Sequence, residues 1–83
     1  MPAPTYQPDP AHVHLRRADP ARNLARFYSL TLQCSLFGGH DLVRRWGRIG
    51  THGTTLIESF ADEGAALAAL ERLAERKRRR GYA

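Results

Sequence analysis

The sequence of 83 residues has little that would place it outside the cytoplasm. Its one cysteine, Cys34, has no partner for an internal disulfide, so nothing links the fold to an oxidising compartment. No stretch approaches the roughly 20 apolar residues that span a bilayer, and the first residues lack the basic and apolar regions of a signal peptide. We therefore expect a cytoplasmic protein that does not associate with membranes.

Residues suited to catalysis or metal binding are also sparse. The four histidines are scattered, and with one cysteine they do not promise the converging ligands that a metal ion needs. No Ser-His-acid triad or pair of carboxylates stands out. A chain of this length has room for one domain with a modest core. These absences predict a non-enzymatic domain without a metal or other cofactor.

The sequence is rich in positive charge. Thirteen lysines and arginines stand against eight acidic residues, which gives a formal net charge of +5. Such a balance favours an anionic partner, either nucleic acid or an acidic surface, and the charge alone does not distinguish them.

Four prolines lie within the first ten residues, where they remove backbone donors and disfavour a helix. They predict an extended lead-in over residues 1–10, followed by one domain over residues 11–83. Within that domain, a weak alternation predicts a short edge strand, and a clear apolar–polar alternation from Tyr28 predicts a half-buried strand. Glycine-rich turns and a β-branched segment complete the pattern. The expected strands cover residues 12–16, 28–36, 42–49 and 54–60, with turns at 38–41 and 50–53.

From Asp62 onward the period of the apolar residues changes to that of an amphipathic helix. Asp62 is the expected N-cap, and Gly81 is the expected stop. We therefore predict a small α+β fold, in which an antiparallel sheet of about four strands is covered on one face by a single C-terminal helix. Cys34 shares a face with Leu30 and Leu32, which predicts a packed thiol.

The strand expected over residues 42–49 carries the most informative pattern. Val43 and Ile49 share one parity, whereas Trp46 shares the other with Arg44 and Arg48. If Val43 and Ile49 face the core, a tryptophan between two arginines is exposed on the opposite face. The alternatives are that Trp46 belongs to the core and that the arginines are solvated or pair with acidic residues. The candidate acidic partners are Asp41, Glu58 and Asp62.

A glycine inside this strand, Gly47, is a further signal. Glycine weakens a strand, and it marks either the close approach of a ligand or backbone or a simple bulge. The basic run over residues 76–80 has two interpretations as well. It either contacts phosphate or forms a solvated cationic cap on the helix.

The run Arg45-Trp46-Gly47-Arg48-Ile49-Gly50-Thr51, followed by Gly53, resembles the signature of the WGR domain family. The resemblance covers roughly residues 23–82, nearly the whole expected domain. Outside the run it is carried by Arg26-Phe27-Tyr28, Leu30, Phe60, Ala66, Leu70, Leu73, Lys77 and Gly81-Tyr82. The chain has no room for a polymerase, and it resembles the small bacterial-type proteins that consist of little more than this domain.

In the DNA-damage-activated poly(ADP-ribose) polymerases, the WGR domain grips the end of a broken DNA strand. The resemblance implies that Trp46 stacks on the sugar of a terminal nucleotide and that Arg48 couples DNA to neighbouring protein. Lys77 matches a basic position near the end of the helix. An asparagine that contacts phosphate in some polymerases is matched only loosely by Asn23, because Ala25 stands in its place.

The leading hypothesis is a monomeric, non-enzymatic module that recognises DNA ends, breaks or junctions through sugar and phosphate. Two alternatives stay open, namely a protein-interaction adaptor that uses the strand face of Trp46 and Arg48, and a small RNA-binding protein. The candidate nucleic-acid-binding residues are Trp46, Arg48, Arg44, Gly47, Arg26, Asn23, Lys77, Arg79 and Arg80.

Overall fold

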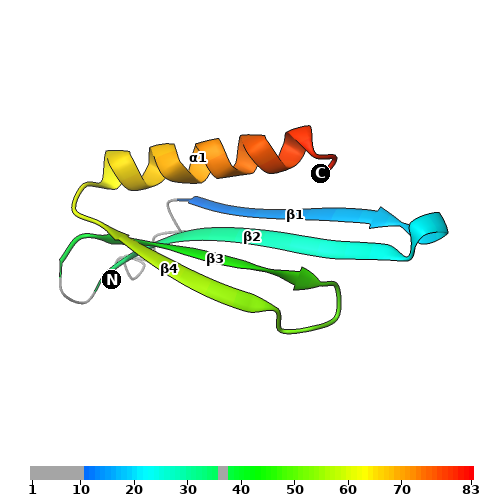
Figure 1. Ribbon diagram of the computed structural model, residues 1–83. Coiled ribbons are helices and arrows are strands. Elements are labelled where there is room, and N and C mark those ends of the chain that lie inside the picture. Colours follow the sequence, from blue (N-terminus) through cyan, green and yellow to red (C-terminus); the bar gives the residue numbers. More distant parts are fainter. Residues whose placement is uncertain (1–10, 36–37) are drawn as a thin grey trace, which may run out of the picture.

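A computed structural model describes residues 11–35 and 38–83, so the lead-in expected over residues 1–10 lies outside the described residues. Four strands form one antiparallel sheet in the order β1-β2-β3-β4, and one helix covers a single face of it (Figure 1). The predicted α+β fold is confirmed. The elements are β1 (Ala11–Asp19), the 3₁₀ turn η1 (Pro20–Arg22), β2 (Leu24–Cys34), β3 (His40–Arg48), β4 (Thr54–Phe60) and α1 (Glu63–Arg79).

The first two strands are longer than the alternation predicted. Pairing between β1 and β2 continues to Asp19 and Leu24, where η1 reverses the chain. His40 and Asp41, expected in a turn, are already paired with β2. The strand expected over residues 54–60 is confirmed. Hydrogen bonding along the ladder therefore extends the strands through polar residues that carry no apolar pattern.

Both predicted caps of α1 are confirmed. The Asp62 carboxylate accepts a hydrogen bond of 2.9 Å from the Ala65 amide, which satisfies a free donor of the first turn. Gly81 adopts a φ of 97°, and the Tyr82 amide then donates to the Lys77 carbonyl at 3.1 Å. This turn directs the Tyr82 side chain back onto the core.

The core lies between α1 and the adjacent face of the sheet. Small side chains on α1 allow the helix to approach the sheet closely, where Leu30, Leu32 and Leu42 become fully buried. The buried core consists of Tyr28, Leu30, Leu32 and Leu42 from the sheet and Ala66, Ala69, Leu70 and Ala74 from α1.

The parity assumed for β3 is wrong. Leu42 is 0% exposed in the core, and Trp46 has the same parity. Trp46 therefore lies on the helix-covered face, half-buried against the core, whereas Val43 lies on the face that α1 leaves open. Alternation cannot show which parity faces the helix when both contain apolar residues. Trp46 consequently belongs both to the margin of the core and to the surface.

The expected packed thiol is also wrong, because Cys34 is exposed. It shares the parity of the core leucines, but it is the last residue of β2, beyond Leu32, the last buried residue of that strand. Parity alone does not bury a side chain where the covering layer ends.

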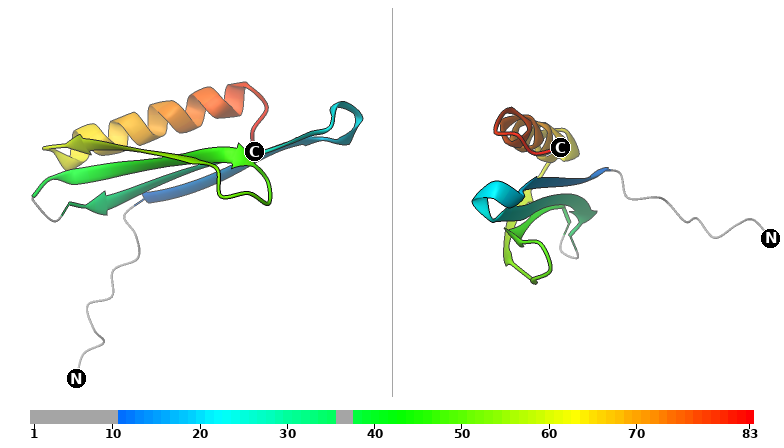
Figure 2. Two further views of the ribbon diagram at one scale, coloured as in Figure 1. Left: turned by 60° about the horizontal axis from the view of Figure 1, so that its bottom comes forward. Right: turned by 90° about the vertical axis from the view of Figure 1, so that its right-hand side faces the viewer.

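The helix is shorter than the central strand β2 beneath it. At 1.5 Å per residue the 17 residues of α1 extend about 26 Å, whereas the 11 residues of β2 at about 3.4 Å each extend about 37 Å. The β1–β2 hairpin accordingly projects past the C-terminal end of α1 (Figures 1 and 2). About 10 Å of the covered face is left open at this end.

The outer edge of β1 is bonded to the last residue of the chain. The Ala83 amide donates to the Arg16 carbonyl at 2.8 Å, and the Arg16 amide donates to the Ala83 carbonyl at 2.9 Å. This reciprocal pair is the pattern of antiparallel strands. It fixes the segment that follows α1 against the sheet.

Gly47 is explained by the turn between β3 and β4. A methyl group at Gly47 would lie 2.8 Å from the Gly53 Cα, so the turn can fold back on β3 only where the strand has no side chain. Gly53 has a φ of 78° and lies tightly against the Trp46 carbonyl and the Phe27 ring. The close approach that glycine predicted at this position is therefore made by the protein's own backbone.

We predict that Gly47→Ala lowers the free energy of unfolding by about 1–3 kcal/mol, the usual cost of overpacking. The urea midpoint of the purified protein measures the loss. Ser29→Ala, on the same open face of β2, is the control and is expected to change stability by less than about 0.5 kcal/mol. An unaltered midpoint for Gly47→Ala would show that the turn can move away from β3.

Candidate functional site

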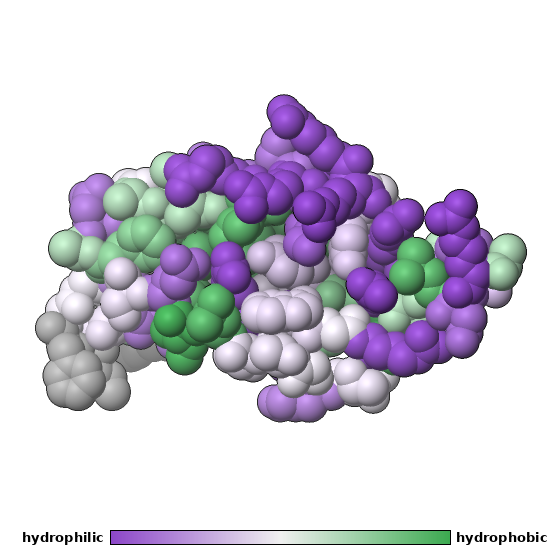
Figure 3. Space-filling view, viewed as in Figure 1, coloured by the Kyte–Doolittle hydropathy of each residue, from purple (hydrophilic) through white to green (hydrophobic). Residues whose placement is uncertain are grey.

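The candidate site lies around Trp46, where α1 ends and the sheet continues. Two hollows flank this side chain, with volumes of about 520 Å³ and 240 Å³. Figure 3 shows hydrophilic side chains gathered along α1 and at the end of the sheet that projects beyond it. We call the walls of these hollows the Trp46 surface, whose principal side chains are Arg26, Tyr28, Arg44, Trp46, Arg48, Arg76, Lys77, Arg80 and Tyr82.

Three aromatic rings form the floor of this surface. The centroid of the Tyr28 ring lies 6.3 Å from that of Trp46 and 6.4 Å from that of Tyr82. The Lys77 ammonium lies 4.6 Å from the Tyr28 centroid and 5.4 Å from the Tyr82 centroid. The last turn of α1 therefore holds Lys77 against two ring faces, in the geometry of a cation–π contact.

Arg44 connects Trp46 with the neighbouring strand. Its guanidinium carbon lies 5.8 Å from the centre of the Trp46 ring, and a nitrogen lies 3.6 Å from a Glu58 carboxylate oxygen. Glu58 was one of the acidic partners considered from the sequence. The Arg44 Nε is buried without a hydrogen-bond partner among residues 11–35 and 38–83. Arg44 is thus fixed on one side and retains unused donor capacity.

The site has an excess of positive charge. Burial lowers the pKa of Lys77 first, and four neighbouring guanidinium groups lower it further. Those groups belong to Arg80, Arg44, Arg26 and Arg76. Burial has the opposite effect on an acidic group, so it raises the pKa of the Tyr28 hydroxyl and keeps the phenol neutral. A bound anion would relieve the repulsion among these cations.

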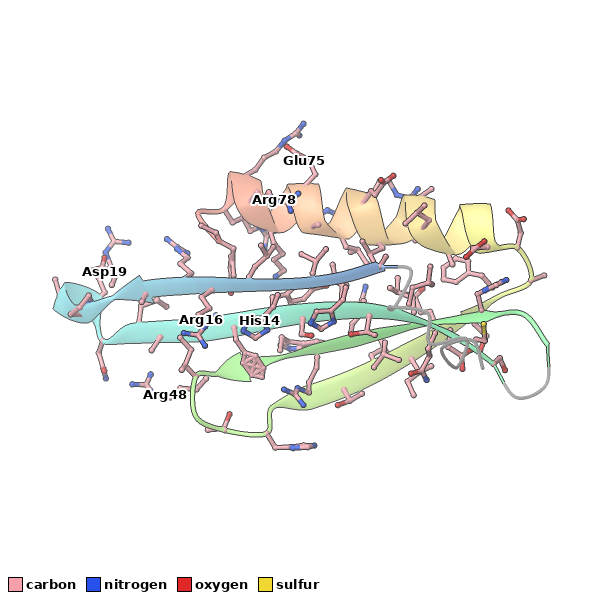
Figure 4. The ribbon with its side chains drawn as sticks, turned by 180° about the vertical axis from the view of Figure 1, so that it is seen from behind. His14, Arg16, Asp19, Arg48, Glu75 and Arg78 are labelled. Atoms are coloured by element: carbon pink, nitrogen blue, oxygen red, sulfur yellow. The ribbon has the colours of Figure 1, made fainter. Side chains whose placement is uncertain are left out.

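Arg48 is used within the protein. Its two terminal nitrogens donate to the backbone carbonyl of Asn23 at 3.3 Å and to the Asn23 side-chain oxygen at 3.1 Å. Asn23 has a φ of 53°, the left-handed conformation that asparagine tolerates better than most residues. Within the described part of the chain Arg48 makes no ion pair with Asp41, Glu58 or Asp62. It connects the end of β3 with the β1–β2 hairpin (Figure 4).

The structure brings together most of the residues proposed from the sequence. Arg26, Arg44, Trp46, Gly47, Arg48, Lys77 and Arg80 all line the two hollows. Asn23 lies beside them through its bonds to Arg48. Arg79 lies apart, paired with Glu75 at 3.4 Å on α1.

The candidate list from the sequence lacked Tyr28, Tyr82 and Arg76, although Arg76 belongs to the basic run considered for phosphate contact. A usable signal existed for Arg76, because Leu73, Arg76, Lys77 and Arg80 follow the i, i+3, i+4, i+7 spacing of one helix face. Tyr28 gave no separate signal, since its alternation indicates only a buried strand residue. Its role depends on Lys77, which is distant in sequence.

The described ranges contain no group of three or more histidine, cysteine or acidic side chains placed to share a metal ion. Among those residues, no helix has both the length and the apolar character needed to cross a membrane.

These features define a small α+β domain with a cationic and aromatic surface suited to a polyanion. The family model of the WGR domain matches residues 11–83. The chain therefore belongs to the WGR domain family, which is consistent with nucleic-acid binding in general terms.

One curated relative is an uncharacterized protein, y4dW, of Sinorhizobium fredii (strain NBRC 101917 / NGR234). The two sequences are 41% identical over 73 residues, which is 88% of this chain and 36% of the relative. The chain thus spans about a third of the length of that relative. No solved structure matches the present chain.

The contact between Asn23 and Arg48 gives a testable prediction. Asn23→Ala is expected to lower the free energy of unfolding by about 1–2 kcal/mol, because alanine is strained in the left-handed region. Asn23→Gly should cost less, since glycine adopts this conformation freely and the backbone carbonyl still accepts from Arg48. Chemical denaturation of both variants measures the difference, and equal losses would show that the conformation at Asn23 does not matter.

Proposed function

We propose that the chain is a non-enzymatic nucleic-acid-binding module whose Trp46 surface contacts the sugar–phosphate backbone at DNA ends, breaks or junctions. The observation that carries this proposal is the cluster of cations around Lys77. Four arginines are close enough to lower the pKa of Lys77, and Glu58 is the one carboxylate that forms an ion pair with this cluster among residues 11–35 and 38–83. Phosphodiester groups supply the missing negative charge.

The arrangement of Trp46 supports recognition of ends. One side of its ring system belongs to the margin of the core, and the rest borders both hollows. Nucleotides inside a duplex are stacked above and below, whereas an end, a nick or an unpaired strand leaves a sugar or base free for an aromatic ring. The resemblance to the polymerases implies the same position for the motif tryptophan.

Salt dependence separates this function from that of a protein-interaction adaptor. Binding to phosphates releases counterions, so the affinity for DNA should fall steeply with salt. An adaptor would bind a protein partner through the same surface. Its contacts would include Arg48, whose side chain is held in place by hydrogen bonds to Asn23. Weak, salt-insensitive binding to DNA would favour the adaptor, and tighter binding to RNA of matched sequence would favour an RNA-binding protein.

We expect Lys77→Met and Arg26→Met each to weaken binding to a blunt duplex by about tenfold, the effect of losing one hydrogen bond to a charged group. The slope of log affinity against log salt should fall by about 0.9 for each phosphate that the variant no longer neutralises. Arg72→Met is the matched control, because it removes one charge from an exposed position outside the Trp46 surface. Fluorescence anisotropy at several salt concentrations measures these values. If the two variants bind as Arg72→Met does, the Trp46 surface does not bind the duplex.

A second experiment tests the preference for ends. The parent should bind blunt, nicked and single-stranded DNA more tightly than a covalently closed duplex of the same sequence. Trp46→Leu should reduce that preference by about tenfold, because stacking contributes roughly 1–3 kcal/mol, while leucine retains part of the packing against the core. Thermal melting confirms that the variant is folded. Equal affinity of the parent for open and closed duplexes would contradict end recognition.

A further inference from the structure

The face of the sheet opposite α1 carries a second group of basic side chains. His14 and Arg16 on β1 lie close together there, toward the turn that joins β3 and β4 (Figure 4). Phe27 on β2 is only 5% exposed, although α1 does not cover this face. The His14 ring stacks on it with centroids 6.2 Å apart and 12° between the planes. The Arg45 guanidinium carbon lies 5.3 Å from the centre of the Phe27 ring.

The two arginines of this group, Arg16 and Arg45, lack negative partners among the described residues. Within the two described ranges neither Arg16 nor Arg45 forms an ion pair, and the buried Arg45 Nε has no hydrogen-bond partner. Asp41 is the one acidic strand residue whose parity places it on this face among the described residues. It lies four residues from Arg45, about 13 Å along β3, and accepts a hydrogen bond of 2.8 Å from Ser59. Arg45 is therefore fixed by an aromatic ring and not by a carboxylate.

A hollow of about 140 Å³ lies between these groups, with the side chains of His14, Arg16 and Arg45 among its walls. Positive charge held in place by an aromatic ring, with donor groups left free, suits a phosphodiester oxygen. The basic side chains of this hollow lie on the opposite face of the sheet from those of the Trp46 surface, and Phe27 of β2 borders both. A straight duplex is stiff over about 150 base pairs and cannot lie on both faces of one domain.

We infer that Arg16 and Arg45, beside the stack of His14 and Phe27, form a second phosphodiester site that binds the backbone of another nucleic-acid segment. One chain then bridges two segments, one on each face of its sheet. The class of ligand rests on the proposed function, whereas the site itself is separate from the Trp46 surface.

The test uses short duplexes with two different fluorophores and the full chain at low salt, analysed by sedimentation velocity. The parent should form complexes of one protein chain with both duplexes. Arg45→Met retains an unbranched apolar side chain over Phe27 and removes the charge, so it should fold as the parent does. It should reduce the bridged complex by about tenfold, with less than about a twofold change in the affinity of the 1:1 complex. Arg16→Met should act in the same direction, and Arg72→Met is the control for the loss of one charge.

The outcomes separate the two proposals. If the parent binds single duplexes and forms only 1:1 complexes, the second site is refuted and the proposed function stands. Bridged complexes that always contain two protein chains would also refute it, because self-association would then explain the bridge. Loss of bridging in Arg45→Met with 1:1 binding retained, but no loss of bridging in Arg72→Met, supports two distinct sites. A parent that binds no duplex at all overturns both proposals.

Discussion

The difference in length between α1 and the central strands is the constraint on which the site depends. The alanine and leucine face of α1 covers Leu30, Leu32 and Leu42 of the sheet, but the helix stops before the β1–β2 hairpin does. At this boundary a ring such as that of Trp46 has a packed side and an open side. Arginines on the uncovered part of the sheet meet cations from the last turn of α1. A longer helix would bury these charges without partners, which is costly.

The positive charges gathered at this boundary lower the stability of the free protein. Lys77 lies on two tyrosine rings, and its pKa is lowered by burial and by four arginines. Its protonated form is therefore less favourable in the folded protein than in the unfolded chain. This destabilising contribution to the free energy of unfolding is fully present at neutral pH. It is relieved as the pH rises through the lowered pKa of Lys77. A ligand with phosphate groups would remove the same penalty at constant pH, so part of its binding energy would come from the charge repulsion already present in the free protein.

The sequence predicted the order of the elements, both helix caps and most residues of the site, because periodicity and capping are local properties. It could not predict which face of β3 meets the helix. Val43 and Leu42 are both apolar, and the choice between them depends on α1, which lies more than 20 residues away. The hydrogen bond between Asn23 and Arg48 joins segments that are distant in sequence, and so does the contact of Arg45 with the Phe27 ring. Local patterns could not predict either contact. Gly47 was recognised as unusual, but its cause is the position of the following turn.

The reciprocal hydrogen bonds between Arg16 and Ala83 also have a practical consequence for protein engineering. A polypeptide attached after Ala83 leaves the domain beside β1, in the direction of an antiparallel fifth strand. A rigid or β-rich fusion partner can therefore extend the sheet and cover its edge, whereas a glycine-rich linker is free to turn away. A cleavable tag joined through such a linker leaves the edge of β1 as it is in the isolated domain.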